Sequence, residues 1–329
     1  MDAPKTYDVV GIGSAIVDVS AAVDDNFLAG HELVKGTMAL IDMDGAAALR
    51  SSLTAPTLAS GGSTSNTMAG LASFGGVGAF VGKVADDDLG HRFVEEMGSI
   101  GVDFLADPAS GTLPTAQSIV LVTPDAQRTL NTYLGVAGQL CEDDVPLDVV
   151  AGSKVLFTEG YMWDSPSAKQ AVEAAAAEAK AHGVAVAFSL SDPLCVDRHR
   201  SEFADFLSTS VDIVFGNADE VASVYQADDE TSLQLLGQST SLAFITKGAE
   251  GSVVLQGEQR TLVDAFTLGD VVDTTGAGDQ YAAGVLYGLT HGKEPAQAAR
   301  LGSLAGAEAV THMGPRPLVK LADLAADNL

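Results

Sequence analysis

The sequence has few groups that could cross-link it or bind a soft metal. Only two cysteines, Cys141 and Cys195, occur in 329 residues. Two are too few for a disulfide framework or a cysteine-based zinc site, and they fit a reducing compartment. No apolar run approaches the ~18–20 residues that span a bilayer, and residues 1–5 lack the basic and apolar segments of a secretory signal. We therefore expect a cytoplasmic protein without a membrane segment.

Positive charge is also scarce, because 17 Lys and Arg residues stand against 44 Asp and Glu residues, a formal net charge of −27. Repulsion of this size disfavours binding to nucleic acid or to an anionic membrane, so the expected partner is a small molecule. A phosphate site in such a chain must draw its positive potential from helix N-termini, Mg²⁺ and a few basic side chains.

Short apolar runs alternate with helical patterns along most of the chain. Runs that are apolar at successive positions suit a sheet covered on both faces. The alternation predicts an α/β fold with a doubly wound, mostly parallel sheet flanked by helices. The predicted strands are 7–13, 79–84, 154–159, 184–190, 212–216 and 242–247, and the predicted helices are 65–74, 89–100, 167–182, 219–225, 279–289 and 296–310.

Two stretches break this alternation. Residues 36–42 and the pair 116–123 and 129–134 are typical of strands without crossover helices, and Thr123–Ala126 is typical of a turn, which makes the pair a hairpin. We expect a small β-sheet lid, formed by about residues 14–45 and 112–136, inserted into a single domain over residues 1–329. Closure of a lid excludes water from a site.

The most specific motif is the run Asp273–Asp279. Val271 and Val272 are typical of a buried strand that leads into a turn of small residues, and an apolar helix follows. Small residues at 276–278 leave the first-turn amides uncovered, and a helix N-terminus with its partial positive charge attracts an anion. The carboxylate of Asp279 beside such an anion site could accept a proton from an attacking hydroxyl, so this motif predicts phosphoryl transfer.

A second glycine-rich segment, Ser60–Asn66, precedes a helix of small residues. Gly61 and Gly62 allow a ligand to approach the backbone closely, and Asn66 offers both a donor and an acceptor. Asp18 lies just beyond the first predicted strand, where its carboxylate could accept two hydrogen bonds from the vicinal hydroxyls of a ribose or another sugar.

These two motifs resemble the signatures of the ribokinase-like (PfkB) carbohydrate and nucleoside kinases, and the resemblance runs from Asp8 to about Pro317. It implies that Asp279 is the catalytic base. It further implies that the amides of Gly276, Ala277 and Gly278 form an anion hole. The acceptor-binding residues that it implies are Asp18, Gly62, Ser63, Asn66 and Arg128.

Two shorter segments resemble the parts of this family that bind ATP. Asn217–Glu220 is similar to an Asn-x-x-Glu element that organises Mg²⁺ and phosphate, with Glu220 acting on the metal through water. Thr246–Ser252 resembles a nucleotide-binding turn in which Gly248 and Gly251 make room for ATP. The implied ATP-binding residues are Asn217, Glu220, Thr246, Gly248 and Gly251. The resemblance also suggests a monovalent cation, such as K⁺, between Asp273, Thr275 and Gly314.

Within the family, residues 13–20, 23–25, 128–133 and 159–161 look most like the bacterial adenosine kinases. The resemblance therefore implies transfer of a phosphoryl group from ATP to the 5′-hydroxyl of adenosine, a reaction of purine salvage, by a monomer or homodimer. A sugar kinase acting on ribose, fructose or a related sugar is one alternative, and a non-catalytic sensor on the same fold is another. Phe157, Tyr161 and Trp163 are candidates for stacking on a base.

Overall fold

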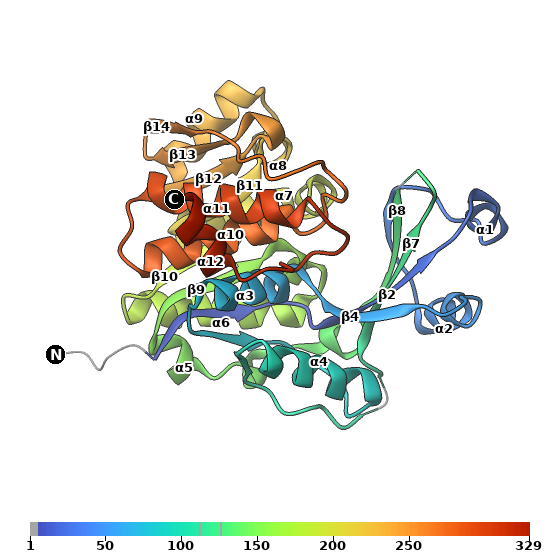
Figure 1. Cartoon of the computed structure of the whole chain (residues 1–329). Coiled ribbons are helices and arrows are strands. Elements are labelled where there is room, and N and C mark those ends of the chain that lie inside the picture. The colour runs from blue at the N-terminus through green and yellow to red at the C-terminus, as the bar shows by residue number, and fades with distance from the viewer. Residues whose placement is uncertain (1–5, 112, 126) are drawn as a thin grey trace.

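The computed structural model describes residues 6–111, 113–125 and 127–329. In this part of the chain the main sheet has nine strands, in the order β14-β13-β12-β11-β10-β9-β1-β5-β6 (Figure 1). The strands from β12 to β6 run parallel, and β13 and β14 continue the sheet antiparallel. Their bounds are β1 (Tyr7–Ile12), β5 (Gly78–Val81), β6 (Val102–Phe104), β9 (Ser153–Glu159), β10 (Ala185–Ser189), β11 (Ile213–Asn217), β12 (Leu242–Thr246), β13 (Ser252–Gln256) and β14 (Gln259–Val263).

Helices cover both faces of this sheet. One apolar cluster joins α3 (Ser63–Phe74), α4 (Asp88–Ser99), α10 (Ala277–Thr290) and α11 (Pro295–Ala309) to one face. A second cluster joins the opposite face to α5 (Leu147–Ala151), α6 (Pro166–Ala181), α7 (Pro193–Thr209), α8 (Ala218–Tyr225) and α9 (Asp229–Ser239). The C-terminal helix α12 (Leu321–Asn328) packs against α3. The predicted doubly wound, mostly parallel α/β fold is thus confirmed.

A smaller sheet of five strands projects to one side of the main sheet (Figure 1). Its order is β3 (Met38–Leu40), β8 (Arg128–Tyr133), β7 (Ala116–Val122), β2 (Ile16–Ala22) and β4 (Thr57–Gly61). The helices α1 (Asp25–Gly30) and α2 (Met43–Ser51) cover one face through Val19, Leu28, Leu49, Ile119 and Leu121. Because side chains alternate along a strand, Asp18 lies on the other face.

The strands β7 and β8 pair antiparallel, as the predicted hairpin requires, although Ala126 of the predicted turn lies outside the described residues. Thr112 and residues 1–5 lie outside them too. The sequence did not predict β4, which pairs antiparallel with β2. Across the described residues, no helix is long and apolar enough to cross a membrane.

The strand predicted at Val271 and Val272 is wrong. These residues lie in an irregular segment between β14 and α10, and their side chains are 68% and 46% exposed. The amide of Val272 bonds to the carbonyl oxygen of Val310 at the end of α11 (2.7 Å) instead of to a neighbouring strand. Val271 borders the cavity between this segment, α10 and α11, and β14 remains the edge strand of the main sheet.

Candidate active site

Two cavities meet at the N-terminus of α10. The inter-sheet cavity, of about 420 Å³, lies between the main sheet and the small sheet and contains Asp18 and Asp279 in its wall. The loop cavity, of about 370 Å³, lies between α10, α11 and the segment that carries Val271. Thr246 and Gly278 line both cavities. This arrangement could hold two ligands with their ends in contact at the first turn of α10.

The backbone at the start of α10 explains the small residues of the motif. Gly276 caps the helix in the left-handed region (φ 76°), and a Cβ atom there would collide with Pro315. The amide of Ala277 bonds to the carbonyl oxygen of Thr274 (3.2 Å), whereas the amides of Gly276 and Gly278 form no hydrogen bond with the described residues. Those two amides are therefore free to bind an anion at the helix N-terminus.

Asp279 is held by side chains of α3. The hydroxyl of Ser63 donates to Asp279 Oδ1 (2.6 Å), and the amide of Asn66 donates to Oδ2 (3.0 Å). Burial raises the pKa of Asp279 to about 6, although these two hydrogen bonds and the charge of Arg316 oppose the shift. Gly62 allows α3 to begin here, because its φ of 93° and the adjacent Ser14 carbonyl oxygen exclude a larger residue. Asp279 is therefore a fixed carboxylate whose pKa lies close to neutral pH.

Asp18 enters the same cavity from β2. Burial raises the pKa of Asp18 to about 7, and the positive charges of Arg316 and Arg128 limit the rise. Glu159, at the end of β9, also lines the cavity, where it accepts the amides of Ser14 (3.1 Å) and Thr64 (2.6 Å). Its two oxygens therefore join the start of the small sheet to the start of α3.

Asn217 and Glu220 form a reciprocal cap at the start of α8. The side chain of Asn217 accepts the amide of Glu220 (2.9 Å), and Glu220 accepts the backbone and side-chain amides of Asn217 (3.0 and 2.7 Å). Both residues line the inter-sheet cavity and a smaller cavity beside Asp279, not the loop cavity. Burial raises the pKa of Glu220 to about 7, so a cation nearby would favour its ionised form.

The residues fit a magnesium ion that binds partly through other ligands. No group of three or more His, Cys, Asp or Glu side chains within the described ranges could hold a metal by itself. Mg²⁺ in phosphate-transfer sites commonly uses one or two carboxylates, several waters and the substrate phosphates. Glu220 could supply such a carboxylate in the wall of the inter-sheet cavity and of the smaller cavity beside Asp279.

Arg128 links the small sheet to the loop before α10. Its guanidinium pairs with Asp273 (2.6 Å) and donates to the hydroxyl of Thr275 (2.7 Å). Asp273 also accepts the amides of Thr275 (3.0 Å) and Gly314 (2.9 Å). The structure thus brings together the three residues predicted for a monovalent cation, and Arg128 supplies the positive charge among them. Arg128 does not line the inter-sheet cavity in this conformation.

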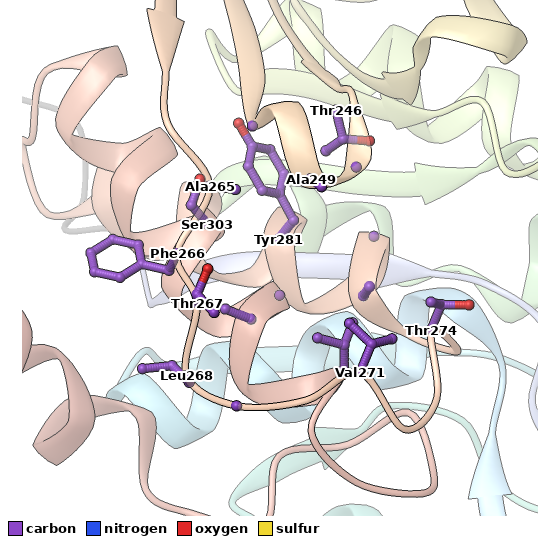
Figure 2. A pocket seen from close by; sticks show the side chains of 18 residues that line it. Thr246, Ala249, Ala265, Phe266, Thr267, Leu268, Val271, Thr274, Tyr281 and Ser303 are labelled. Carbon is purple, nitrogen blue, oxygen red and sulfur yellow. The ribbon is translucent and has the colours of Figure 1, made fainter.

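The loop cavity contains the predicted turn and a segment that the sequence did not reveal. Thr246, Gly248 and Gly251 line it, and they also form the turn between β12 and β13. Figure 2 shows Phe266, Thr267, Leu268 and Val271 on the loop that borders this cavity. These loop residues carry no periodic pattern or glycine motif, so no sequence signal could have identified them.

The sequence also did not predict the apolar wall of the inter-sheet cavity. It comes largely from the small sheet, with Ile16, Met38, Leu40, Leu130 and Leu134. The alternation of Leu130, Thr132 and Leu134 in the predicted hairpin was the available signal.

The structure separates the three aromatic residues proposed for base stacking. Tyr161 lines the inter-sheet cavity. Phe157 is buried in the core against Phe215, and Trp163 is buried against Phe188 and its neighbours. Tyr161 is therefore the candidate that remains.

Comparison with known proteins agrees with this geometry. Residues 8–321 match the pfkB family of carbohydrate kinases. A crystal structure of adenosine kinase from Sinorhizobium meliloti is 48% identical and covers 98% of this chain and 99% of its own, with a TM-score of 0.93. A probable sugar kinase from Rhizobium etli is 42% identical, covers 98% of each chain and also has a TM-score of 0.93.

Curated relatives are more distant. The 5-dehydro-2-deoxygluconokinase of Bacillus subtilis is 29% identical over 311 residues, which are 91% of this chain and 88% of the relative. Kinases of this family use ATP as a co-substrate and phosphorylate hydroxyl groups of small molecules. This chain belongs to the PfkB family of carbohydrate kinases.

Proposed function

We propose that this kinase transfers the γ-phosphoryl group of ATP to the 5′-hydroxyl of adenosine. The observation that carries the proposal is the shape and chemistry of the inter-sheet cavity. Its wall combines two carboxylates, Asp18 and Asp279, with the aliphatic side chains of the small sheet and with Tyr161. A free sugar would leave this apolar wall without a contact, whereas the base of a nucleoside could cover it. The likeness to the S. meliloti adenosine kinase supports the same acceptor.

In the proposed mechanism, Asp18 accepts hydrogen bonds from the ribose hydroxyls, and Asp279 accepts the proton of the 5′-hydroxyl as that oxygen attacks. A base works best when its pKa lies near the operating pH, and the pKa of Asp279 of about 6 satisfies this condition. Ser63 and Asn66 hold the carboxylate in place. The amides of Gly276 and Gly278 bind the phosphoryl oxygens as negative charge moves between the two ligands.

The loop cavity would hold the nucleoside part of ATP, with Thr246, Gly248 and Gly251 in its wall. Mg²⁺, when bound, would neutralise phosphate charge, and Glu220 and Asn217 would hold it through water. The small sheet would act as a lid over the acceptor. We expect a monovalent cation to bind beside Asp273 only after Arg128 has left that carboxylate and turned toward the phosphates. The free thiols of Cys141 and Cys195 fit a cytoplasmic location.

A sugar kinase is the second candidate, and polar groups of the same cavity favour it. Ser118 and Thr132 also line the wall, with their hydroxyl oxygens 3.0 Å apart, and they could bind the hydroxyls of a sugar. The names of the R. etli and B. subtilis relatives point to sugar acceptors as well.

One assay separates the two candidates. Consumption of MgATP is measured with adenosine, inosine, guanosine, ribose and fructose, with and without K⁺. We expect turnover with adenosine and none with the free sugars, and we expect Asp279→Asn to lower turnover by ~10²–10⁴-fold because the general base is lost. Asp323→Asn, at an exposed position of α12, serves as the control. Turnover with a sugar but not with a nucleoside would overturn the proposal, and so would a fully active Asp279→Asn enzyme.

A further inference from the structure

The turn Gly314–Arg316 reaches the catalytic centre from the C-terminal part of the chain. The amide of Gly314 donates to Asp273 (2.9 Å). The side-chain amide of Gln280, the residue after Asp279, donates to the carbonyl oxygens of Pro315 (2.9 Å) and Asn66 (3.0 Å). The turn is thus fixed by residues on both sides of the α10 N-terminus, and its position depends on the same backbone that forms the anion site.

This fixed turn places the side chain of Arg316 behind Asn66. Arg316 Nε donates to Asn66 Oδ1 (3.3 Å), and a terminal nitrogen of the guanidinium donates to the hydroxyl of Ser65 (3.2 Å). Both partners are buried, with Asn66 5% exposed and Ser65 fully covered. The side chain is therefore held from two directions at the start of α3.

The orientation of the Asn66 amide follows from these contacts. Arginine can only donate hydrogen bonds, and an ionised carboxylate can only accept them. Asn66 must therefore present its oxygen to Arg316 and its N–H to Asp279. With the opposite orientation, the amide oxygen would lie against a carboxylate oxygen of Asp279, which disfavours the ionised acid.

We propose that Arg316 is a positioning residue, which orients the amide of Asn66 and so keeps Asp279 ionised and ready to accept the proton of the acceptor. The inference rests on the proposed function only in taking Asp279 as the base. Arg316 does not line either cavity, so it acts through Asn66 and through its charge.

The charges around Asp279 make this contribution necessary. Among the described residues, three acids without a paired cation face the same space, namely Glu159 of β9, Asp18 of β2 and Glu220 of α8, whereas Asp164 also lines it but is paired with Arg198. The bases that act on this space are Arg128 of β8 and Arg316. The charge of Arg316 also interacts with Glu96 of α4. Because Arg128 is paired with Asp273, removal of Arg316 would leave Asp279 among three acids with no cation directed at it.

The test compares pH profiles of kcat/KM for Arg316→Gln, Arg316→Lys and the wild type. Arg316 lowers the pKa of both Asp279 and Asp18, and both carboxylates contribute to the acidic limb. Loss of its charge and of the oriented amide is expected to raise the pKa of this limb by about one unit in Arg316→Gln. The variant should then lose about five- to tenfold activity at pH 5.5–6 and almost none at pH 8.5, since the base is ionised there. Arg316→Lys keeps the charge but not the planar fork, so we expect a smaller shift.

A matched control removes the same charge elsewhere. Arg260 lies on β14 and forms an exposed ion pair with Glu230 of α9, so Arg260→Gln removes this pair and should leave the profile unchanged. An equal loss at every pH in Arg316→Gln would indicate a purely structural role and would overturn the proposal, as would an unshifted profile. If Arg316→Gln does not fold, as judged by thermal unfolding, Arg316→Lys decides between the same outcomes.

A second measurement does not need the acceptor. The carboxyl carbon of Asp279 is titrated by ¹³C NMR in the wild type and in Arg316→Gln, with Asp279→Asn used to assign the signal. A pKa that rises in the variant supports the proposal, and an unchanged pKa refutes it. If the wild-type enzyme does not phosphorylate adenosine but the pKa of Asp279 still rises in Arg316→Gln, the proposed acceptor is refuted and the role of Arg316 is retained.

Discussion

Replacement of Asp18 by asparagine tests the way in which the acceptor is bound. Asp18 lies in the wall of the inter-sheet cavity, on β2, and the ribose hydroxyls of adenosine are its proposed partners. A hydrogen bond to a charged group contributes ~1.5–3 kcal/mol, against ~0.5–1.5 kcal/mol for a neutral pair. Each of the two bonds should therefore weaken by ~1–1.5 kcal/mol in Asp18→Asn.

The sum over two bonds predicts a loss in kcat/KM for adenosine of about 30–150-fold, since 1.4 kcal/mol corresponds to tenfold. For 2′-deoxyadenosine only one bond remains to be weakened, so the loss should be about 5–12-fold. The assay is run at pH 8, because the pKa of Asp18 of about 7 means that about half of the Asp18 carboxyl groups of the free enzyme are protonated at neutral pH.

Initial rates for both nucleosides with wild type and Asp18→Asn form a double-mutant cycle between enzyme and substrate. Asp44→Asn, an exposed residue at the start of α2, controls for charge on the small sheet. Equal losses for adenosine and 2′-deoxyadenosine would show that Asp18 does not bind the ribose hydroxyls, and the reasoning from its place in the cavity would be refuted.

Two further predictions follow from the charges. Folding raises the pKa of Asp18 from 3.8 to about 7, so its ionised form destabilises the folded enzyme above pH 7, and this penalty falls as the pH is lowered towards 4. Asp18→Asn should therefore raise the free energy of unfolding of the ligand-free enzyme, measured in urea, by up to about 4 kcal/mol at pH 8 and by less at lower pH. A stabilisation that does not depend on pH would contradict this prediction. Because the net charge of −27 repels MgATP, kcat/KM for MgATP should rise between 20 and 200 mM NaCl as screening increases, and a fall would show that local positive potential dominates the encounter.

The sequence was informative for candidate site residues that lie at the ends of helices and strands. Gly62 and Gly276 are required by positive φ angles and by close backbone contacts, so each leaves a glycine signal in the sequence. The carboxyl ends of parallel strands meet at one edge of a sheet, which is why Asn217 and Thr246, from neighbouring strands, lie near Asp279.

The sequence was less informative where a position depends on packing between distant segments. Val271 and Val272 have the composition of a strand, but the sheet ends at β14, and Val271 lines the loop cavity instead. Met38 and Leu40 look like ordinary strand residues, and only the pairing of β3 with β8 places them in the wall of the inter-sheet cavity. Arg316 is 250 residues from Asn66, so its contact could not be read from local spacing.

The scarcity of positive charge in the whole protein extends to its candidate active site. No lysine or arginine is among the described residues that line the two cavities, and the two nearby arginines face carboxylates, Arg128 at Asp273 and Arg316 at Asp18 and Asp279. In the proposed mechanism, the phosphoryl group would therefore be stabilised by the amides of Gly276 and Gly278, by a bound cation and by Arg128 after its release from Asp273. Backbone amides act only if their positions are fixed, and this explains why the start of α10 is held so closely by the turn at Pro315.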